Sequence, residues 1–161
     1  MPAPEIDLAF LLNQTSYALA TRMTAELAGL GITPRMYCVL MKAEPGGLTQ
    51  NQIAEQAALD KTTMVVTLDE LERSGLAERR PSDTDRRARI VALTPAGKRT
   101  LTRAHAIVNR VYDDILGSLP TRERSAFLAG LTTLAGGALA EPSHISRPVR
   151  RRAPRSPALT G

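Results

Sequence analysis

The stretch SDTDRRARIVALTPAGKRTL, residues 82–101, joins a highly charged segment to a short apolar run and then to a helical pattern. Its first eight residues hold three arginines and two aspartates, a composition typical of a loop that faces solvent or a polyanion. The run IVAL that follows is β-prone. Thr94 and Pro95 then supply a helix N-cap and a proline at the first helical position. The stretch predicts a charged hairpin loop, its returning strand and the start of a helix.

The segment upstream predicts a helix-turn-helix. Residues 49–52 form a capping box, in which the Thr49 and Gln52 side chains each bond to a backbone N–H. A short helix follows, and Asp60 caps a second helix that is predicted over residues 61–74. The predicted inner stripe of this second helix is Met64, Val65, Leu68 and Leu71. Two short helices joined by a tight turn are typical of this motif.

A β-hairpin is predicted directly after the helix-turn-helix. Residues 76–80 and 88–93 read as its strands and residues 81–87 as its loop, so the hairpin is a wing. Five arginines fall within eleven residues here: Arg79, Arg80, Arg86, Arg87 and Arg89. Clustered arginine favours phosphate binding, and a merely solvated hairpin is the alternative.

Helical patterns flank this region on both sides. Residues 5–30 and 34–44 read as two helices, Thr94 and Pro95 open a helix of about 24 residues, and Thr121 caps a last helix. The last helix carries the apolar residues Phe127, Leu128, Leu131, Leu134 and Leu139. Terminal helices with apolar faces and no third layer to cover them favour a homodimer. A monomer that folds these helices back on itself is the alternative.

The composition is that of one small domain with a basic tail. The chain has 161 residues, 43% of them hydrophobic, and a formal net charge of +5. Residues 141–161 hold five arginines and one glutamate without periodicity, so they read as a disordered tail that adds sequence-independent DNA affinity or is inert. The chain has one cysteine, no apolar run long enough for a membrane helix and no basic leader. These features predict a cytoplasmic protein with no membrane partner.

Three motifs resemble the MarR family of bacterial transcription regulators. DRRARIVALTPAG, residues 85–97, matches the family's wing pattern of Asp-x-Arg, a strand ending in Leu-Thr and a helix that starts with small residues. LDELERSGLAERR, residues 68–80, matches the end of the recognition helix and the first wing strand. TPRMYCVL, residues 33–40, matches the opening of the second helix. The resemblance covers about residues 5–139 and leaves the tail outside.

The resemblance implies a mainly α fold with a small β-hairpin wing, in which a winged helix-turn-helix domain is joined to a helical dimerisation region. We expect an N-terminal dimerisation helix at 1–32, the winged domain at 33–94, C-terminal dimerisation helices at 95–140 and the tail at 141–161. The implied protein is a homodimeric repressor at the bacterial nucleoid. It would leave a pseudo-palindromic double-stranded operator when a small aromatic or phenolic ligand binds.

The predicted recognition helix would enter the major groove by its N-terminal end. There the chain has Lys61, Thr62 and Thr63, whose side chains can bond to phosphates or base edges. Val66, one turn further on, can contact a thymine methyl. Many relatives carry a longer polar residue at the position of Val66, so strong readout of guanine there is not expected. The alternative is that the threonines only start the helix.

The resemblance also assigns roles on the wing. Arg87 aligns with the wing arginine that enters a narrow minor groove, and Arg86 is a second candidate. Asp85 would orient a wing arginine or cap the turn, because its own charge repels phosphate. The remaining arginines of the cluster are candidate phosphate contacts: Arg79, Arg80 and Arg89.

An effector pocket would draw on the first, second and fifth helices of the family fold. The polar or aromatic candidates there are Asn13, Tyr17, Arg22, Tyr37 and His105. A redox-sensing repressor that uses Cys38 is an alternative. Cys38 lies in mid-helix without an adjacent histidine or lysine, and peroxide-sensing relatives place their reactive cysteine in the first helix, so the role of a small hydrophobe is favoured.

The sequence does not indicate an enzyme. It holds no metal-ligand cluster, no nucleophile with a plausible base and no phosphate loop, and its two histidines, His105 and His144, lie far apart. We therefore expect no catalytic residue, metal or cofactor. A winged-helix module that binds protein instead of DNA is a further alternative, against which the basic wing argues.

Overall fold

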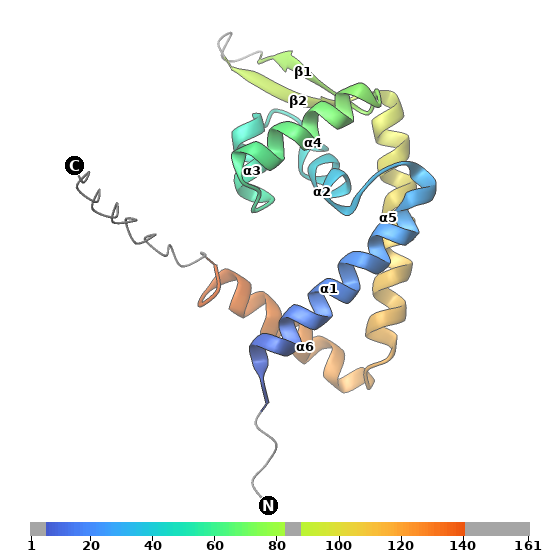
Figure 1. Ribbon diagram of the computed structural model, residues 1–161, viewed down its shortest axis with the longest axis vertical. Helices are drawn as coiled ribbons and strands as arrows, with labels where there is room; N and C mark the ends of the chain where they lie inside the picture. The colour runs from blue at the N-terminus through green and yellow to red at the C-terminus, as the bar shows by residue number, and fades with distance from the viewer. Residues whose placement is uncertain (1–5, 83–87, 141–161) are drawn as a thin grey trace, which may run out of the picture. The chain divides into compact units, whose positions relative to one another are not determined.

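The computed structural model describes residues 6–82 and 88–140, and within these ranges the chain forms α-helices, one 3-10 turn and one β-hairpin (Figure 1). The elements are α1 (Leu8–Leu27), η1 (Ala28–Leu30), α2 (Pro34–Ala43), α3 (Gln50–Gln56), α4 (Lys61–Arg73), β1 (Ala77–Pro81), β2 (Arg89–Leu93), α5 (Pro95–Gly117) and α6 (Thr121–Gly136). The mainly α fold with a small hairpin wing is therefore confirmed. The chain divides into two compact units, residues 1–118 and residues 119–161, and α6 belongs to the second.

Side-chain caps fix where the helices of the first unit begin. The Thr33, Asp60 and Thr94 side chains each accept a hydrogen bond from a backbone N–H three residues further on, at 2.9–3.1 Å. The capping box at Thr49 is also present, and the backbone N–H of Thr49 donates to Oε1 of Gln52 at 2.8 Å. These four predicted helix starts are confirmed, because each cap depends only on residues close together in the chain.

The predicted cap of the last helix is wrong. Pro120 holds the N-cap position of α6 without a side-chain bond, and Thr121 is the first helical residue. Proline fixes its own φ near the value that the chain needs before a helix, so the helix starts without a hydroxyl cap. The first helix also ends earlier than predicted. It becomes a 3-10 turn at Ala28, and Gly31 closes that turn with a left-handed φ of 67°.

The helix-turn-helix packs around a dense apolar core. Leu40 of α2, Ile53 of α3 and Met64, Leu68 and Leu71 of α4 are completely buried. Burial of these side chains removes their apolar surface from water, which is the main stabilising term for such a small domain. The core therefore fixes the axis of α4 relative to α2 and α3.

One member of the predicted inner stripe of α4 is wrong. Val65 is 40% exposed, whereas Thr67 is buried. Thr67 tolerates burial because its hydroxyl donates to the backbone carbonyl of Thr63 at 2.8 Å, which satisfies its one polar group. Val65 is consequently left on the surface of α4, beside Val66, which is 53% exposed.

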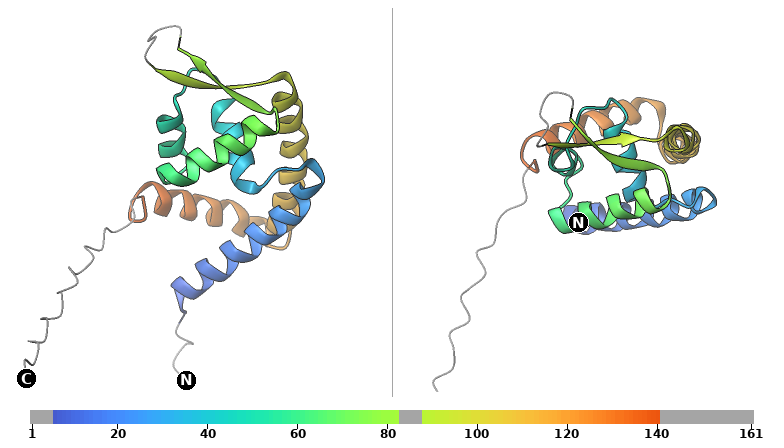
Figure 2. Two further views of the ribbon diagram at one scale, coloured as in Figure 1. Left: turned by 45° about the horizontal axis from the view of Figure 1, so that its top comes forward. Right: turned by 90° about the horizontal axis from the view of Figure 1, so that it is seen from above.

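The wing strands are antiparallel and begin one residue later than predicted, at Ala77 and Arg89. The backbone N–H of Val91 donates to the carbonyl of Leu48 at 2.9 Å, and Thr49 forms a β-bridge with Ile90. The segment before α3 thus pairs with β2 over a short stretch. Figure 2 shows the hairpin beside α3 and α4. The loop tip, residues 83–87, lies outside the described residues, as do residues 1–5 and the tail at 141–161.

Helices α1 and α5 contact each other and extend the core of the first unit through Met23, Leu27, Leu101 and Val108, all of which are buried. The N-terminal half of α1 and the residues just before it have an uncovered apolar surface, made of Ile6, Leu8, Phe10, Leu11 and Tyr17. Within α6, Phe127, Leu128 and Leu134 are exposed in the same way. Among the helices that the structure describes, none is long and apolar enough to cross a membrane.

Candidate nucleic-acid interface

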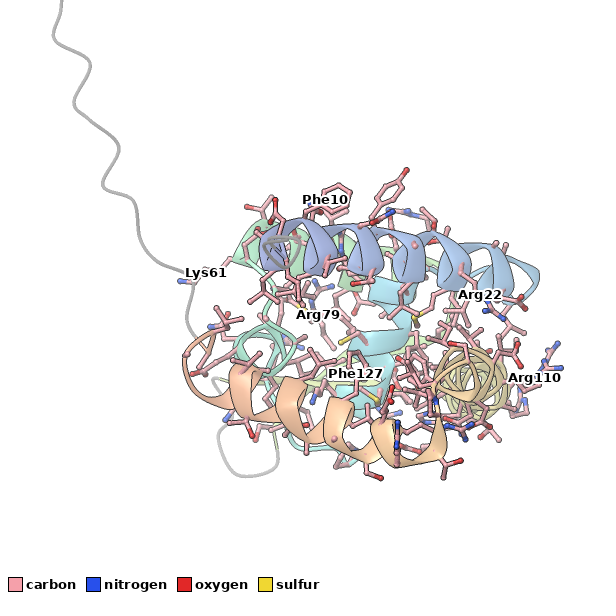
Figure 3. The ribbon with its side chains drawn as sticks, turned by 90° about the horizontal axis from the view of Figure 1, so that it is seen from below. Phe10, Arg22, Lys61, Arg79, Arg110 and Phe127 are labelled. Carbon is pink, nitrogen blue, oxygen red and sulfur yellow. The ribbon has the colours of Figure 1, made fainter. Side chains whose placement is uncertain are left out.

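The N-terminal end of α4 is capped by Asp60, and its first two side chains are exposed. One oxygen of the Asp60 carboxylate accepts from the backbone N–H of Thr63 at 2.9 Å, and the other accepts from the Thr63 hydroxyl at 2.6 Å. These bonds lower the pKa of Asp60 below its ordinary value, and the bond from the Thr63 hydroxyl has the larger effect. Lys61 and Thr62 are exposed next to this cap, and Lys61 projects from the edge of the molecule (Figure 3). The helix therefore presents an ammonium group and a hydroxyl at its positive end.

Arg79 forms a polar clamp between the wing and the two helices of the helix-turn-helix. Its guanidinium donates to Asp69 at 2.8 Å, to the Gln50 side chain at 3.2 and 3.3 Å, and to Glu72. Its backbone N–H donates to the other Glu72 carboxylate oxygen at 2.8 Å. Most of the Arg79 side chain is covered, and its charge is paired with Asp69 and Glu72. The contact of Arg79 with phosphate stays a prediction.

The other wing arginines differ in their surroundings. Arg80 pairs with Glu78, and more than half of its side chain is exposed. Arg89 lies opposite Pro81 in the strand register and is exposed. Asp85, Arg86 and Arg87 lie outside the described residues. The described part of the wing thus holds two arginines, Arg80 and Arg89, at its surface.

The predicted effector residues lie on α1, α2 and α5. The Tyr37 hydroxyl and Nδ1 of His105 are 2.9 Å apart, and their rings meet edge to face across α2 and α5. Burial, followed by the nearby Tyr112, raises the pKa of Tyr37, so its hydroxyl stays protonated at neutral pH. Arg22 instead pairs with Asp114 at 2.6 Å. The remaining two candidates, Asn13 and Tyr17, are exposed on α1.

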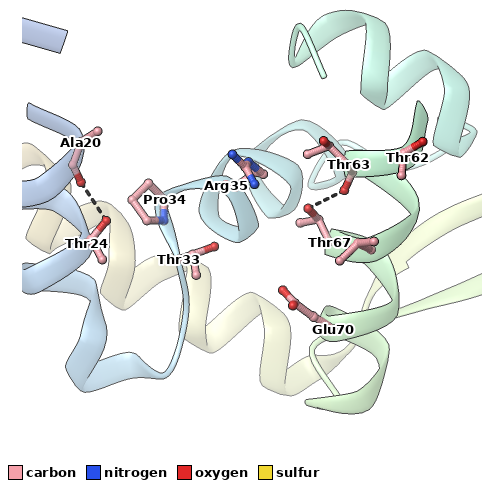
Figure 4. A pocket seen from close by; sticks show the side chains of 10 residues that line it. Ala20, Thr24, Thr33, Pro34, Arg35, Thr62, Thr63, Thr67 and Glu70 are labelled. Atoms are coloured by element: carbon pink, nitrogen blue, oxygen red, sulfur yellow. Dashed lines mark hydrogen bonds between the residues drawn. The ribbon is translucent and has the colours of Figure 1, made fainter. Parts of the chain in front are cut away.

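A cavity of about 560 Å³ opens between α1, the start of α2 and α4. Its lining is Ala20, Thr24, Thr33, Pro34, Arg35, Thr62, Thr63, Val66, Thr67 and Glu70, and none of the five predicted effector residues is among them. Figure 4 shows Thr24 on one side of this cavity and Thr63, Thr67 and Glu70 on the other. The size is within the range of small-molecule sites. Sequence reasoning missed this cavity because three separate segments line it.

The thiol of Cys38 is half-buried on α2. Burial raises the pKa of Cys38 above its ordinary value, and nearby Lys42 lowers it by less. The thiolate, which is the reactive form, is therefore scarce at neutral pH.

The comparisons with known proteins agree with this fold. The model of the MarR family matches residues 30–88. A putative transcriptional regulatory protein for the hcr operon of Thauera aromatica is 33% identical over 105 residues, which are 65% of this chain and 63% of that protein. This chain therefore matches somewhat less than two thirds of the length of that regulator.

Solved structures extend the similarity over most of the chain. CouR from Rhodococcus jostii RHA1, bound to p-coumaroyl-CoA, superposes with a TM-score of 0.74 at 26% identity, over 91% of this chain and 100% of that one. The transcriptional repressor CouR bound to a 23-mer DNA duplex superposes with a TM-score of 0.72 at 32% identity, over 80% of this chain and 92% of that one. The capped α4, the adjoining wing and these matches lead to one conclusion: the chain belongs to the MarR family of transcriptional regulators.

Proposed function

We propose that this protein is a homodimeric repressor that binds a pseudo-palindromic DNA operator and leaves it when a small aromatic ligand binds. The observation that carries the proposal is the exposed, capped N-terminal end of α4 beside an arginine-rich wing. In addition, the sequence of this chain is 32% identical to that of a repressor whose structure was solved with bound DNA. The proposed DNA contacts on α4 are Lys61, Thr62, Thr63 and Val66.

The wing would contact the backbone and the minor groove next to the major groove that α4 enters. Arg80 and Arg89, which are exposed, suit phosphate contacts. Arg86 and Arg87 at the loop tip suit a narrow minor groove, where the negative potential is enhanced. A second copy of the chain would place a second α4 about one helical turn of DNA away.

The test is binding of the full chain to labelled DNA from its own upstream region at several salt concentrations. We expect affinity to fall steeply with salt, because each neutralised phosphate releases counterions. The variant Arg86→Ala/Arg87→Ala should bind more weakly, and its salt slope should be smaller by about 2.

The matched control is Arg103→Ala/Arg110→Ala, which removes the same charge from exposed positions of α5. It should keep the salt slope of the original protein. Equal binding to unrelated DNA would contradict the proposed operator recognition. Unchanged binding by the Arg86 and Arg87 variant would contradict the role of the wing.

The effector is the second part of the proposal. A relative with 26% identity binds p-coumaroyl-CoA, a thioester of a phenolic acid, and this chain has a cavity of suitable size next to α4. Arg35 in the lining can pair with an anionic group, and the threonine hydroxyls can bond to polar atoms of a ligand.

A panel of aromatic acids and their CoA thioesters, added to the protein–DNA complex, tests this effector proposal. At least one compound should release the DNA, and Arg35→Met should weaken that release. If no compound in the panel releases DNA or binds the free protein, the effector class is wrong. The redox alternative is less well supported, since burial keeps the Cys38 thiol protonated.

A further inference from the structure

We propose that α4 selects thymine, through contacts of Val65 and Val66 with the C5-methyl groups of thymines in the major groove of each half-site. This inference rests on the proposed function, because it states what the recognition helix reads within the operator. It adds Val65, which the sequence pattern assigned to the core, to the DNA-reading face.

Four residues share the solvent-facing side of α4. Thr62, Val65, Val66 and Asp69 are separated by three and four positions, which brings them onto one face of the helix. All four are exposed, and the buried stripe of α4 lies on the opposite side. This face begins in the first turn of the helix, which is the part of a recognition helix that reaches base edges.

The two valines are only partly covered in the folded monomer. Val65 is 40% exposed and Val66 is 53% exposed, so much of their apolar surface is in water. Both are β-branched, and a β-branched residue is a poorer helix former than alanine. An apolar partner in the complex would remove this surface from water, and the thymine methyl is the apolar group that the major groove offers.

The polar alternatives on this face are limited. Bidentate readout of guanine needs arginine or lysine, and bidentate readout of adenine needs asparagine or glutamine. Between Lys61 and Arg73, the two ends of α4, the helix has none of these four residue types. Asp69 could accept from the amino group of cytosine, but its carboxylate already accepts from Arg79 at 2.8 Å. Apart from Lys61 at the start of the helix, methyl contacts and the Thr62 hydroxyl are left for readout.

The experiment first selects binding duplexes for the full chain from a pool with a random 20-base-pair core, a length of about two helical turns. Each thymine of the selected half-site is then replaced singly by 2′-deoxyuridine, which removes only the C5-methyl group. At one or more adjacent thymines we expect the affinity to fall about fourfold, the factor that corresponds to one buried methyl-sized group.

The uridine series is repeated with Val65→Ala/Val66→Ala. In this variant, replacing thymine by uridine should leave the affinity almost unchanged, because the side chains that contact the methyl group have been removed. The matched control is Glu26→Ala, which truncates an exposed side chain of α1 away from α4 and should keep the full uridine effect. The series on the unaltered protein needs no variant, so a variant that folds poorly does not remove the test.

The possible outcomes separate the two proposals. A uridine effect that the double alanine variant abolishes supports thymine readout by the valines. A selected half-site without a uridine effect, or with an effect that persists in the double variant, overturns this inference and leaves the proposed function intact. A failure to select any sequence overturns the proposed function, and the inference with it.

Discussion

Gly97, in the first turn of α5, has its backbone packed against the backbone of Leu76 at the start of the wing. A Cβ atom at Gly97 would overlap the Leu76 carbonyl oxygen. Thr94 strengthens this contact, since its backbone N–H donates to the Leu76 carbonyl at 3.1 Å and its hydroxyl donates to the Gly75 carbonyl at 2.7 Å. The glycine is needed for close approach, and its backbone conformation is an ordinary helical one.

Replacement of Gly97 by alanine should therefore destabilise the protein. We expect Gly97→Ala to lower the free energy of unfolding by about 1–3 kcal/mol, because the two backbones must move apart. Gly117→Ala in the same helix is the control: a Cβ there meets open space, and the change should be neutral or stabilising by up to about 1 kcal/mol. Urea unfolding of both variants measures the difference. Equal stability of the two would show that the junction yields without cost.

Cys38 allows a second prediction at the scale of a residue. Because burial raises its pKa, the thiol loses its proton only at a higher pH than a free cysteine does, which is about 8.5. The rate of alkylation by iodoacetamide should be low at pH 7 and should rise with a midpoint above that of a cysteine-containing peptide. DNA binding should also be insensitive to dilute peroxide. Rapid alkylation near pH 6.5 would contradict this and favour a redox sensor.

At the scale of elements, the wing is joined to the helix-turn-helix by polar contacts as well as by apolar packing. Arg79 of β1 connects Asp69 and Glu72 of α4 with Gln50 of α3. These contacts fix the angle between the strand that carries the wing and the helix that is proposed to enter the major groove. A change in this angle would move the wing relative to its groove without altering either element.

This clamp predicts a coupled response to substitution. Arg79→Met and Glu72→Gln should each lower the free energy of unfolding by about 1–2 kcal/mol, and the double variant should lose less than the sum, since the two groups are partners. Arg80→Met, whose pair with Glu78 is exposed, should cost less than about 1 kcal/mol.

The salt dependence of DNA binding separates the clamp from a phosphate contact. Arg79→Met should leave the slope unchanged, whereas Arg89→Met should reduce it by about 1. A reduced slope for Arg79→Met would instead support the phosphate contact predicted from the sequence.

The helix starts were predictable from the sequence because each cap is a contact within four residues. Thr33, Thr49, Asp60 and Thr94 all bond as their local sequence indicates. The wing strands were predictable within one residue, because the arginine-rich loop separates two β-prone runs.

The candidate site was less predictable, because its details depend on how distant segments meet. The partners of Arg79 lie seven, ten and twenty-nine positions away, and no local pattern brings them together. The sequence placed Val65 in the core, whereas the structure buries Thr67 instead. Both residues are β-branched, and only the bond to Thr63 makes the threonine suitable for burial. The cavity beside α4 was missed for the same reason of distant lining segments.

At the scale of the whole molecule, uncovered apolar surface occurs on both α1 and α6. Phe10 and Phe127 are 58% and 49% exposed, and both helices carry further exposed leucines (Figure 3). Exposed apolar surface is a feature of association sites, and a second copy of the chain is the proposed partner for each helix.

The prediction is that two charged substitutions dissociate the proposed dimer. Phe10→Glu/Phe127→Glu should elute as a monomer of about half the mass of the original protein in light scattering, because burial of two unpaired carboxylates is costly. The control Asn51→Glu/Gln56→Glu adds the same charge at exposed positions of α3 and should remain dimeric. A monomeric original protein would refute the dimer directly.

The contact between Gly97 and Leu76 holds one end of the long helix α5 against the start of the wing. With about 1.5 Å of rise per residue, its 23 residues span about 34 Å from this contact to Gly117. A rotation of α5 by about 5° about this contact would move its far end by about 3 Å, which is the rise of roughly two helical residues. A small tilt of α5 at this contact would therefore be largest at the far end of the helix, and the small size of Gly97 allows the close approach on which the contact depends.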